Sequence, residues 1–313
     1  DYLKYTIAKC DLSKPEKHEE AYRLLSAIYQ KNKKIPDIQY YLAQAAYYNY
    51  NFDEALTNIS SFALNKHISP EAKKNAENLK TLISYARYYY THPGGAKADN
   101  IGSVINTEGD EFGPILTEDQ SQMIYNYTGI KSTGGKQNNT WQKDEKGNYY
   151  PDIYCSIKQE GDFTEPFVVK NINGRGPDIA LSLSHDGRVL FIYRYNDEGR
   201  GDIYQCDLAG HEFSKPYKLK GAVNSGSWEG SCSLSPDGKT LYFISDRPGG
   251  KGGKDIYRAS LAQDSSWTNI INLGDSVNTP FDEESPFMHA DGKTLFYSSK
   301  GRTTSGGFDI FKS

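Results

Sequence analysis

Four acidic side chains recur at one offset beyond residue 104, and they are the residues best placed to do chemistry. Each follows an aliphatic-Asn pair by five residues; the four are Glu111, Asp178, Glu229 and Glu283. If the segments that carry them surround a common axis, their carboxylates form an acidic ring that attracts a cation or a basic peptide. The alternative stays open that each acid accepts hydrogen bonds from amides of its own loop, as Asp and Asn do in turns.

Other candidate catalytic or metal-binding groups lack the spacing that their chemistry needs. The six His residues are scattered, so no pair has metal-ligand spacing. The glycine-rich segment Gly249–Lys254 is preceded by Pro248 and followed by Asp255, where a phosphate-binding P-loop needs Gly and then Ser or Thr. Ser231 and Ser233 lack the Gly-x-Ser-x-Gly motif of a nucleophile elbow. We therefore expect a protein that is not an enzyme and has no metal or cofactor.

The elements that position the four acids follow from an internal repeat of about fifty residues. Asp-Gly turns at Asp186, Asp237 and Asp291 lie 51 and 54 residues apart. Asp-Ile-Tyr or Asp-Ile-Phe motifs begin at Asp152, Asp202, Asp255 and Asp309. The aliphatic-Asn pairs are Ile105-Asn106, Ile172-Asn173, Val223-Asn224 and Val277-Asn278. Each unit has room for about four short strands, which is typical of β-propeller blades that bury their faces against neighbours.

The first unit departs from the repeat in two places. Residues 128–150 form an insertion, and Glu118-Asp119-Gln120 stands in place of the Asp-Gly turn. The Asp that opens each Asp-Ile-Tyr motif is expected to accept hydrogen bonds in a turn and not to bind a ligand, because Asp favours turns.

The repeat resembles a known propeller family. Ser-Pro-Asp-Gly-Lys-Thr-Leu-Tyr-Phe-Ile-Ser-Asp-Arg at 235–247, followed by Asp-Ile-Tyr-Arg at 255–258, looks like the TolB-type, WD-like repeat. The resemblance covers residues 104–313 and is strongest in the last two units. It implies an all-β propeller of antiparallel four-stranded blades. Four units are visible, and the last stops at Lys312-Ser313 inside its final strand, so we expect further sequence to complete the propeller.

The segment before the repeats has helical apolar spacing. Apolar residues fall on one face in successive stretches of residues 1–92, and Lys14-Pro15, Ile35-Pro36, Asn49–Asn51 and Ser69-Pro70 separate about five helices. Ser69 followed by Pro70 and Glu71 predicts an N-cap with Pro at the first helical position. Residues 93–103 form the expected linker.

Part of this helical domain resembles tetratricopeptide repeats. Leu42-Ala43, Phe52–Ala55 and Ile59 stand at the offsets of that repeat, with Ala43 in place of its Gly and Gln39 in place of its Trp. The resemblance implies stacked helical hairpins whose concave face holds peptide or protein. The expected fold class is therefore an α+β multidomain chain, with tetratricopeptide-like helices at 1–92 and the propeller at 104–313.

Tyrosine is abundant, with 25 residues, and many lie in the helical domain. Tyr47, Tyr48, Tyr50 and Tyr88 are the candidate protein-binding residues, with Tyr89 and Tyr90 beside them. Tyr is common at interfaces. The alternative, in which about half of these side chains pack between helices, stays open because helices carry their aromatics inward.

Composition excludes several classes of protein. The net charge of -4 argues against nucleic acid as the main partner. No apolar run is long enough for a membrane span. The four Cys residues include no Cys-x-x-Cys pair, so thiolate metal sites are not expected. Cys206 and Cys232 lie in neighbouring predicted blades, where a disulfide and two buried free thiols are the alternatives.

Tetratricopeptide-like helices followed by TolB-like repeats resemble the multidomain OmpA-family envelope proteins of Bacteroidetes-type bacteria, whose C-terminal OmpA-like domain is not present here. The resemblance implies a non-catalytic, periplasmic scaffold associated with the outer membrane. Its partners would be subunits of a type IX secretion or gliding complex, and peptidoglycan through the domains that are not present here. The alternative function is a receptor module whose propeller binds a small ligand or sugar.

Overall fold

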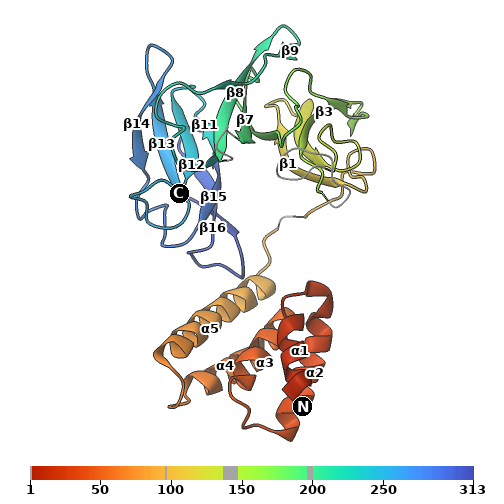
Figure 1. Cartoon of the computed structure of the whole chain (residues 1–313), viewed down its shortest axis with the longest axis vertical. Coiled ribbons are helices and arrows are strands. Elements are labelled where there is room, and N and C mark those ends of the chain that lie inside the picture. Colours follow the sequence, from red (N-terminus) through yellow and green to blue (C-terminus); the bar gives the residue numbers. More distant parts are fainter. Residues whose placement is uncertain (1, 96, 137–146, 196–199) are drawn as a thin grey trace. The chain divides into compact units, whose positions relative to one another are not determined.

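Residues 2–91 fold into helices, as their apolar spacing predicts. The computed structural model describes residues 2–95, 97–136, 147–195 and 200–313. The helices are α1 (Tyr2–Asp11), α2 (His18–Lys31), α3 (Ile38–Tyr48), α4 (Phe52–Ala63) and α5 (Pro70–Thr91), with a short 3₁₀ turn at Pro15–Lys17 (Figure 1). All four predicted breaks are confirmed. Ser69 Oγ accepts from the Ala72 amide at 3.1 Å, and Pro70 is the first residue of α5, so the predicted N-cap is also confirmed.

Small side chains let these helices approach closely. Each helix packs against the next one in sequence. The fully buried alanines that lie at these contacts are Ala8, Ala21, Ala43, Ala45, Ala46, Ala55 and Ala76. This packing of successive helices agrees with helical hairpins, and the larger core side chains Leu25, Leu42, Ile59 and Ile83 complete it.

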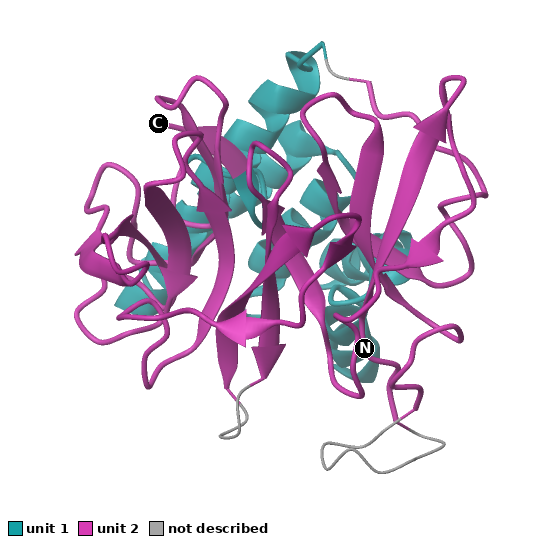
Figure 2. Cartoon of the chain, turned by 90° about the horizontal axis from the view of Figure 1, so that it is seen from above, with its two compact units in different colours: residues 1–96, 303–309 teal, residues 97–302, 310–313 magenta. Residues whose placement is uncertain are grey.

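The chain consists of two compact units, which Figure 2 colours separately. The helical unit comprises residues 1–96 and 303–309, and the propeller unit comprises residues 97–302 and 310–313. Residues 137–146 of the predicted insertion and residue 96 of the predicted linker lie outside the described residues.

The propeller unit consists of four antiparallel sheets in sequence order, which confirms the predicted fold class. Sheet 1 contains β1 (Asp110–Leu116), β2 (Gln122–Thr128), β3 (Asp152–Gln159), β4 (Asp162–Phe163) and β5 (Phe167–Val168). Sheet 2 contains β6 (Ile179–Leu183), β7 (Val189–Tyr195), β8 (Gly201–Ala209), β9 (Glu212–Phe213) and β10 (Tyr217–Lys218). Sheet 3 contains β11 (Glu229–Leu234), β12 (Thr240–Ser245), β13 (Asp255–Leu261) and β14 (Trp267–Asn272), and sheet 4 contains β15 (Glu283–Met288), β16 (Leu295–Ser299) and β17 (Asp309–Lys312).

The expected count of four strands per blade holds only for sheet 3. In sheets 1 and 2, two strands of two residues each take the place of a fourth strand. Both β4 and β5 pair with β3, and both β9 and β10 pair with β8. Sheet 4 has three strands among the described residues. Neighbouring sheets bury their faces against one another. Phe191 and Ile203 of sheet 2, for example, share one core with Leu241 and Phe243 of sheet 3.

The repeat markers occupy equivalent positions in the sheets. The Asp-Gly turns join the first two strands of sheets 2 to 4, and Gly187, Gly238 and Gly292 have φ of 71°, 71° and 65°. In sheet 1, Gln120 takes the same left-handed conformation with φ 57°. The sequence Glu118-Asp119-Gln120 therefore forms the same kind of turn without glycine.

The repeat Asn residues link each sheet to the one before it. The side chains of Asn173, Asn224 and Asn278 each accept from the amide and donate to the carbonyl of an Ile in the preceding sheet, at 2.8–2.9 Å. Those partners are Ile153, Ile203 and Ile256. The Asn side chain thus pairs with the Ile backbone in the way that a neighbouring strand would.

Candidate functional site

Glu229 and Glu283 are buried and hydrogen-bonded within their own sheets. Glu229 accepts from the amide and hydroxyl of Ser225 at 2.8 and 2.6 Å and from the Ser245 hydroxyl at 2.8 Å, and it pairs with Arg247 at 3.1 Å. Glu283 accepts from the amide and hydroxyl of Thr279 at 2.9 and 2.6 Å and from the Ser299 hydroxyl at 2.7 Å. Both side chains are completely buried. These carboxylates therefore fix the loop that leads into the first strand of the sheet.

Glu111 and Asp178 occupy the same offset in sheets 1 and 2 with different partners. Half-buried Glu111 accepts from the amide and hydroxyl of Thr107 at 3.1 and 2.6 Å. Buried Asp178 accepts from the Gly174 amide at 2.6 Å and pairs with Arg194. Burial raises the pKa of Asp178 above its ordinary value, although Arg194 and the Gly174 amide act in the opposite direction.

Strand pairing places Arg194 of sheet 2 where sheets 3 and 4 have Ser245 and Ser299. Arg194 lies opposite Asp202 as Ser245 lies opposite Asp255, and Arg194 pairs with Asp178. Asp178 therefore keeps the register of Glu229 and Glu283, with an arginine in place of the serine hydroxyl. Each of the four acids therefore accepts hydrogen bonds from residues near it in the sequence. Binding of a partner by an acidic ring stays a prediction, and the burial of Asp178, Glu229 and Glu283 weighs against it.

The Asp of the Asp-Ile-Tyr motif holds the loop before it. Asp255 accepts from the amides of Lys251 and Gly252, the latter at 3.2 Å, and from the Asn272 side chain at 3.0 Å. These are amides that a phosphate-binding loop would offer to its ligand. A Cβ on Gly252 would also lie 1.9 Å from the Phe281 carbonyl oxygen, so this glycine serves close packing. Absence of phosphate binding stays a prediction.

All four cysteines are free, so the alternative of a Cys206–Cys232 disulfide is wrong. Cys155, Cys206 and Cys232 are buried, and Cys10 is exposed. Cys206 belongs to the core between sheets 1 and 2, and Cys232 to the core between sheets 2 and 3. The two thiols therefore pack in different cores.

The predicted tyrosines of the helical unit lie in contrasting environments. Tyr47 is half-buried, packs on Phe52 and donates its hydroxyl to the carbonyl of Ser305, which belongs to the same unit. Burial raises its pKa to about 12. Tyr48 stacks on His18 with ring centroids 4.2 Å apart. Tyr47 thus packs within its own unit, as the alternative expects for about half of these side chains, and protein binding by Tyr47 stays a prediction.

Tyr50 and Tyr88 lie at the exposed end of α5, together with two tyrosines beside Tyr88. The exposed fractions of Tyr50, Tyr88 and Tyr90 are 66%, 56% and 62%. The rings of Tyr50, Phe52 and Tyr90 contact one another at 5.4–6.2 Å. Tyr88 contacts Tyr89 at 5.5 Å. We call Tyr50, Tyr88, Tyr89 and Tyr90 the aromatic end of α5.

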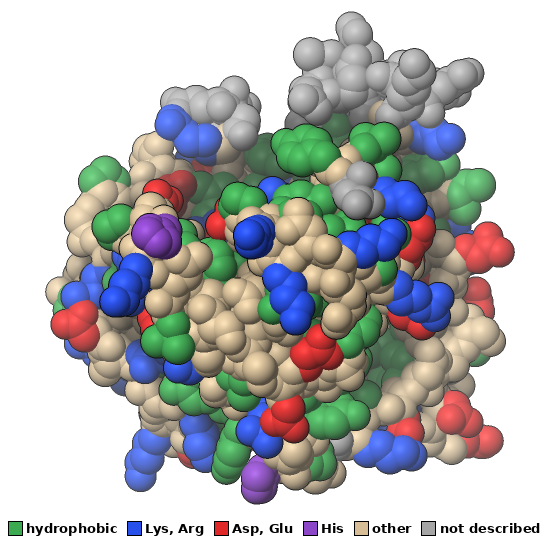
Figure 3. Space-filling view, turned by 90° about the horizontal axis from the view of Figure 1, so that it is seen from below, with side chains coloured by type: hydrophobic (Ala, Val, Ile, Leu, Met, Phe, Trp, Pro, Cys, Tyr) green, Lys and Arg blue, Asp and Glu red, His purple; other side chains and the backbone are tan. Residues whose placement is uncertain are grey.

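Charged side chains do not gather on the face drawn in Figure 3. Lys and Arg are interspersed there with Asp and Glu, and apolar side chains form separate patches between them. This distribution agrees with the mild net charge of -4. That face therefore offers no continuous basic surface of the kind that follows a phosphate backbone.

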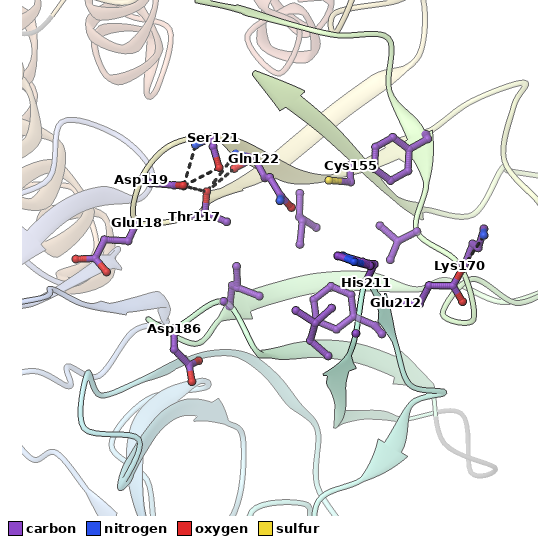
Figure 4. Close-up of a pocket in the computed structure, with 18 of the residues that line it drawn as sticks. Thr117, Glu118, Asp119, Ser121, Gln122, Cys155, Lys170, Asp186, His211 and Glu212 are labelled. Carbon is purple, nitrogen blue, oxygen red and sulfur yellow. Dashed lines mark hydrogen bonds and ion pairs between the residues drawn. The ribbon is translucent and has the colours of Figure 1, made fainter. Parts of the chain in front are cut away.

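A pocket of about 960 Å³ lies between sheets 1 and 2 (Figure 4). Ile124, Leu183 and Phe213 form part of its apolar lining. Two ion pairs join the sheets across it, Glu118 with His185 at 3.1 Å and Lys170 with Glu212 at 2.7 Å. Figure 4 shows Glu118 and Glu212 at opposite ends of the pocket.

The other carboxylates of this pocket are occupied by their own turns. Asp119 accepts from the Thr117 hydroxyl at 2.7 Å and from the Ser121 amide at 3.0 Å, as the dashed lines of Figure 4 show. Asp186 accepts from the Ser184 hydroxyl at 2.6 Å. The pocket therefore combines an apolar lining with ion-paired ends.

A second pocket, of about 460 Å³, is aromatic and lies at the end of sheet 2 where the acids begin their strands. Its aromatic lining consists of Tyr149, Tyr150, Tyr193, Tyr195 and Trp228. We call it the aromatic pocket. None of the described residues that line it is charged.

Sequence reasoning missed both pockets, since none of the eight predicted site residues lines either one. One signal was available. Sheet 2 departs from the repeat beside Tyr193, because Arg194 stands where sheets 3 and 4 have Ser245 and Ser299. No group of three or more His, Cys, Asp or Glu able to hold a metal occurs among the described residues. No helix in the described part of the chain is long and apolar enough to cross a membrane.

Comparison with known proteins gives matches among solved structures alone. No protein-family model matches the chain, and no curated protein matches it. TolB from Acinetobacter baumannii is 21% identical with a TM-score of 0.42, over 67% of this chain and 42% of that one. A putative TolB from Agrobacterium tumefaciens is 17% identical with a TM-score of 0.43, over 67% and 60%. A thermostable family-43 glycoside hydrolase is 12% identical with a TM-score of 0.45, over 68% and 71%. The chain thus spans less than two thirds of either TolB chain.

Proposed function

We propose that this chain is a non-catalytic protein-binding scaffold, and the exposure of the aromatic end of α5 is the observation that carries the proposal. Tyr50, Tyr88 and Tyr90 are each more than half exposed. Tyr is enriched at the centre of protein interfaces because a rigid ring buries much surface at low entropic cost. A run of such side chains at one helix end therefore suits a protein partner.

The propeller unit supports a scaffold role through its stability. Its repeat acids accept hydrogen bonds within their own sheets, and its repeat Asn residues link successive sheets. Carboxylates used in this way hold the blades and are not free for acid or base catalysis. The absence of enzyme activity is part of the proposal.

The cellular setting belongs to the proposal as well. The resemblance of 235–247 to the TolB-type repeat, after helices with tetratricopeptide-like offsets, supports an OmpA-family architecture. On that basis the chain acts in the periplasm in association with the outer membrane. It links a type IX secretion or gliding complex to peptidoglycan through further domains.

The test uses a triple variant of the aromatic end. Tyr88→Ser and Tyr90→Ser are combined with Tyr50→Asn, because Tyr50 has φ 61° and Asn tolerates that left-handed conformation. The matched control is Tyr2→Ser, since Tyr2 is 83% exposed on another helix of the same unit. We expect envelope proteins retained by the wild type and by the control to be lost from the triple variant. Equal retention by all three proteins would refute the proposal.

A second candidate function is a receptor module for a small ligand or sugar. The two pockets favour it, because their volumes of about 960 and 460 Å³ fall within the range of small-molecule sites. Saturable binding of a small molecule, abolished by substitution of a pocket residue and not by the triple variant, is the result that would support it.

A further inference from the structure

We propose that the aromatic pocket binds the pyranose ring of a neutral sugar. The inference deepens the second candidate function and is independent of the scaffold proposal. The pocket is lined by five aromatic side chains from three separate segments, and by Ile179 and Leu181 of the inner strand β6. It is the most aromatic concave surface described in the propeller unit.

The aromatic side chains are held in place before any ligand arrives. The Trp228 indole N–H donates to the Tyr193 hydroxyl at 3.3 Å, and Lys254 Nζ lies 4.4 Å from the Trp228 ring centroid. The rings of Tyr193 and Trp228 also lie directly against glycines. A Cβ on Gly201 or Gly230 would be 2.0 or 2.1 Å from them. Rings fixed in this way lose little further freedom on binding, which favours affinity.

Tyr195 supplies the accessible face. Its side chain is 45% exposed, and its ring contacts Tyr193 at 5.5 Å in an edge-on arrangement. The face of an aromatic ring is electron-rich, so it attracts the polarised C–H groups on the apolar side of a sugar ring. Tyr195 is therefore the residue on which the sugar would stack.

The polar groups of the lining indicate the class of ligand. None of the described lining residues is charged, and Lys254 and Lys136 lie over the rings of Trp228 and Tyr149, at 4.4 and 5.9 Å from their centroids. The polar groups of the described lining include the hydroxyls of Tyr149 and Ser231 and the amide of Asn148. Hydroxyls both donate and accept, as sugar hydroxyls do, so a purely apolar ligand would leave these groups unsatisfied.

A proline-rich peptide is the principal competitor, because such segments also bind aromatic-lined grooves. Its carbonyl groups need donors from the groove. In this pocket the Trp228 indole N–H is already donating to Tyr193. The sugar is thus the better match for the groups that are free to bind.

The experiment titrates the full chain with cellotriose, maltotriose and the N-acetylglucosamine trimer, using saturation-transfer NMR and calorimetry. We expect at least one trisaccharide to bind saturably, and Tyr195→Ala to raise its Kd about tenfold, as loss of one aromatic anchor does. The matched control is Tyr217→Ala, because Tyr217 is 41% exposed in the same sheet and does not line the pocket. It should bind as the wild type does.

Three outcomes would overturn the inference: no saturable binding of any of the three sugars, equal affinity of Tyr195→Ala and the wild type, or binding of decaproline in the same pocket in place of sugar. Unfolding temperatures show that each variant is folded. Failure here leaves the scaffold proposal intact, because the aromatic end of α5 is tested by different variants.

Discussion

The tyrosines of the helical unit and the repeat acids of the propeller unit have opposite environments. Tyr50 and Tyr90 expose 66% and 62% of their surface, and their rings contact one another and Phe52. Glu229 and Glu283 expose none of theirs and are fully engaged with Ser, Thr and backbone donors. The comparison teaches that charge alone does not mark a binding residue. A carboxylate whose lone pairs are used inside the fold is structural, whereas an exposed ring remains available.

Substitution of Glu283 is the change with the largest expected effect on this comparison. Glu283→Ala should lower the free energy of unfolding by about 3 kcal/mol, because it leaves the Thr279 amide and the Ser299 hydroxyl buried without their acceptor. Urea unfolding followed by circular dichroism measures the loss. Glu212→Ala is the control. The ion pair of Glu212 with Lys170 is exposed, so its loss should cost less than about 1 kcal/mol. Equal losses in the two variants would contradict the assignment.

The repeat Asn residues provide a sharper, paired test. Asn278→Ala removes both hydrogen bonds to the Ile256 backbone, and we expect a loss of about 2 kcal/mol. Asn106 opens the first unit, and its side chain donates to Asn100 at 2.9 Å instead of pairing with a strand of a preceding sheet. Asn106→Ala should therefore cost less than about 1 kcal/mol by the same measurement. A larger effect at Asn106 than at Asn278 would show that the Asn contact does not link the sheets.

For the acids in the turns, we expect a smaller effect on stability, and one that depends on pH. Hydrogen bonds from Thr117 and Ser121 lower the pKa of Asp119 to about 2, whereas an unfolded Asp titrates at about 3.9. Because the folded pKa is the lower one, this stabilisation is present above about pH 4 and is lost as pH falls toward 2. The unfolding temperature should therefore fall less steeply between pH 5 and pH 2 for Asp119→Asn than for the wild type. Parallel curves would contradict this role.

Local and periodic features of the fold could be predicted from the sequence. The helix breaks, the Ser69 cap and the spacing of the Asp-Gly turns each depend on a few neighbouring residues. The turn at Gln120 could be placed by its position in the repeat, although no glycine marks it. Local signals of this kind survive folding, because tertiary contacts reinforce them.

The site could be predicted only in part, because it depends on contacts between distant residues. Tyr149, Tyr195 and Trp228 meet in the aromatic pocket from positions far apart in sequence. The ion pair of Asp178 with Arg194 also depends on the pairing of β6 with β7, which places Ile179 opposite Tyr193. Exposure at the aromatic end of α5 likewise depends on which helix faces are covered.

The most direct test of the central claim is site-specific photocrosslinking in cells, with p-benzoylphenylalanine in place of Tyr50 or, as the control, of Tyr2. Both side chains are exposed on the helical unit, but Tyr50 alone belongs to the aromatic end of α5. The account predicts a discrete crosslinked envelope protein from position 50 and none from position 2. No crosslink at position 50, or the same products from both positions, would contradict it.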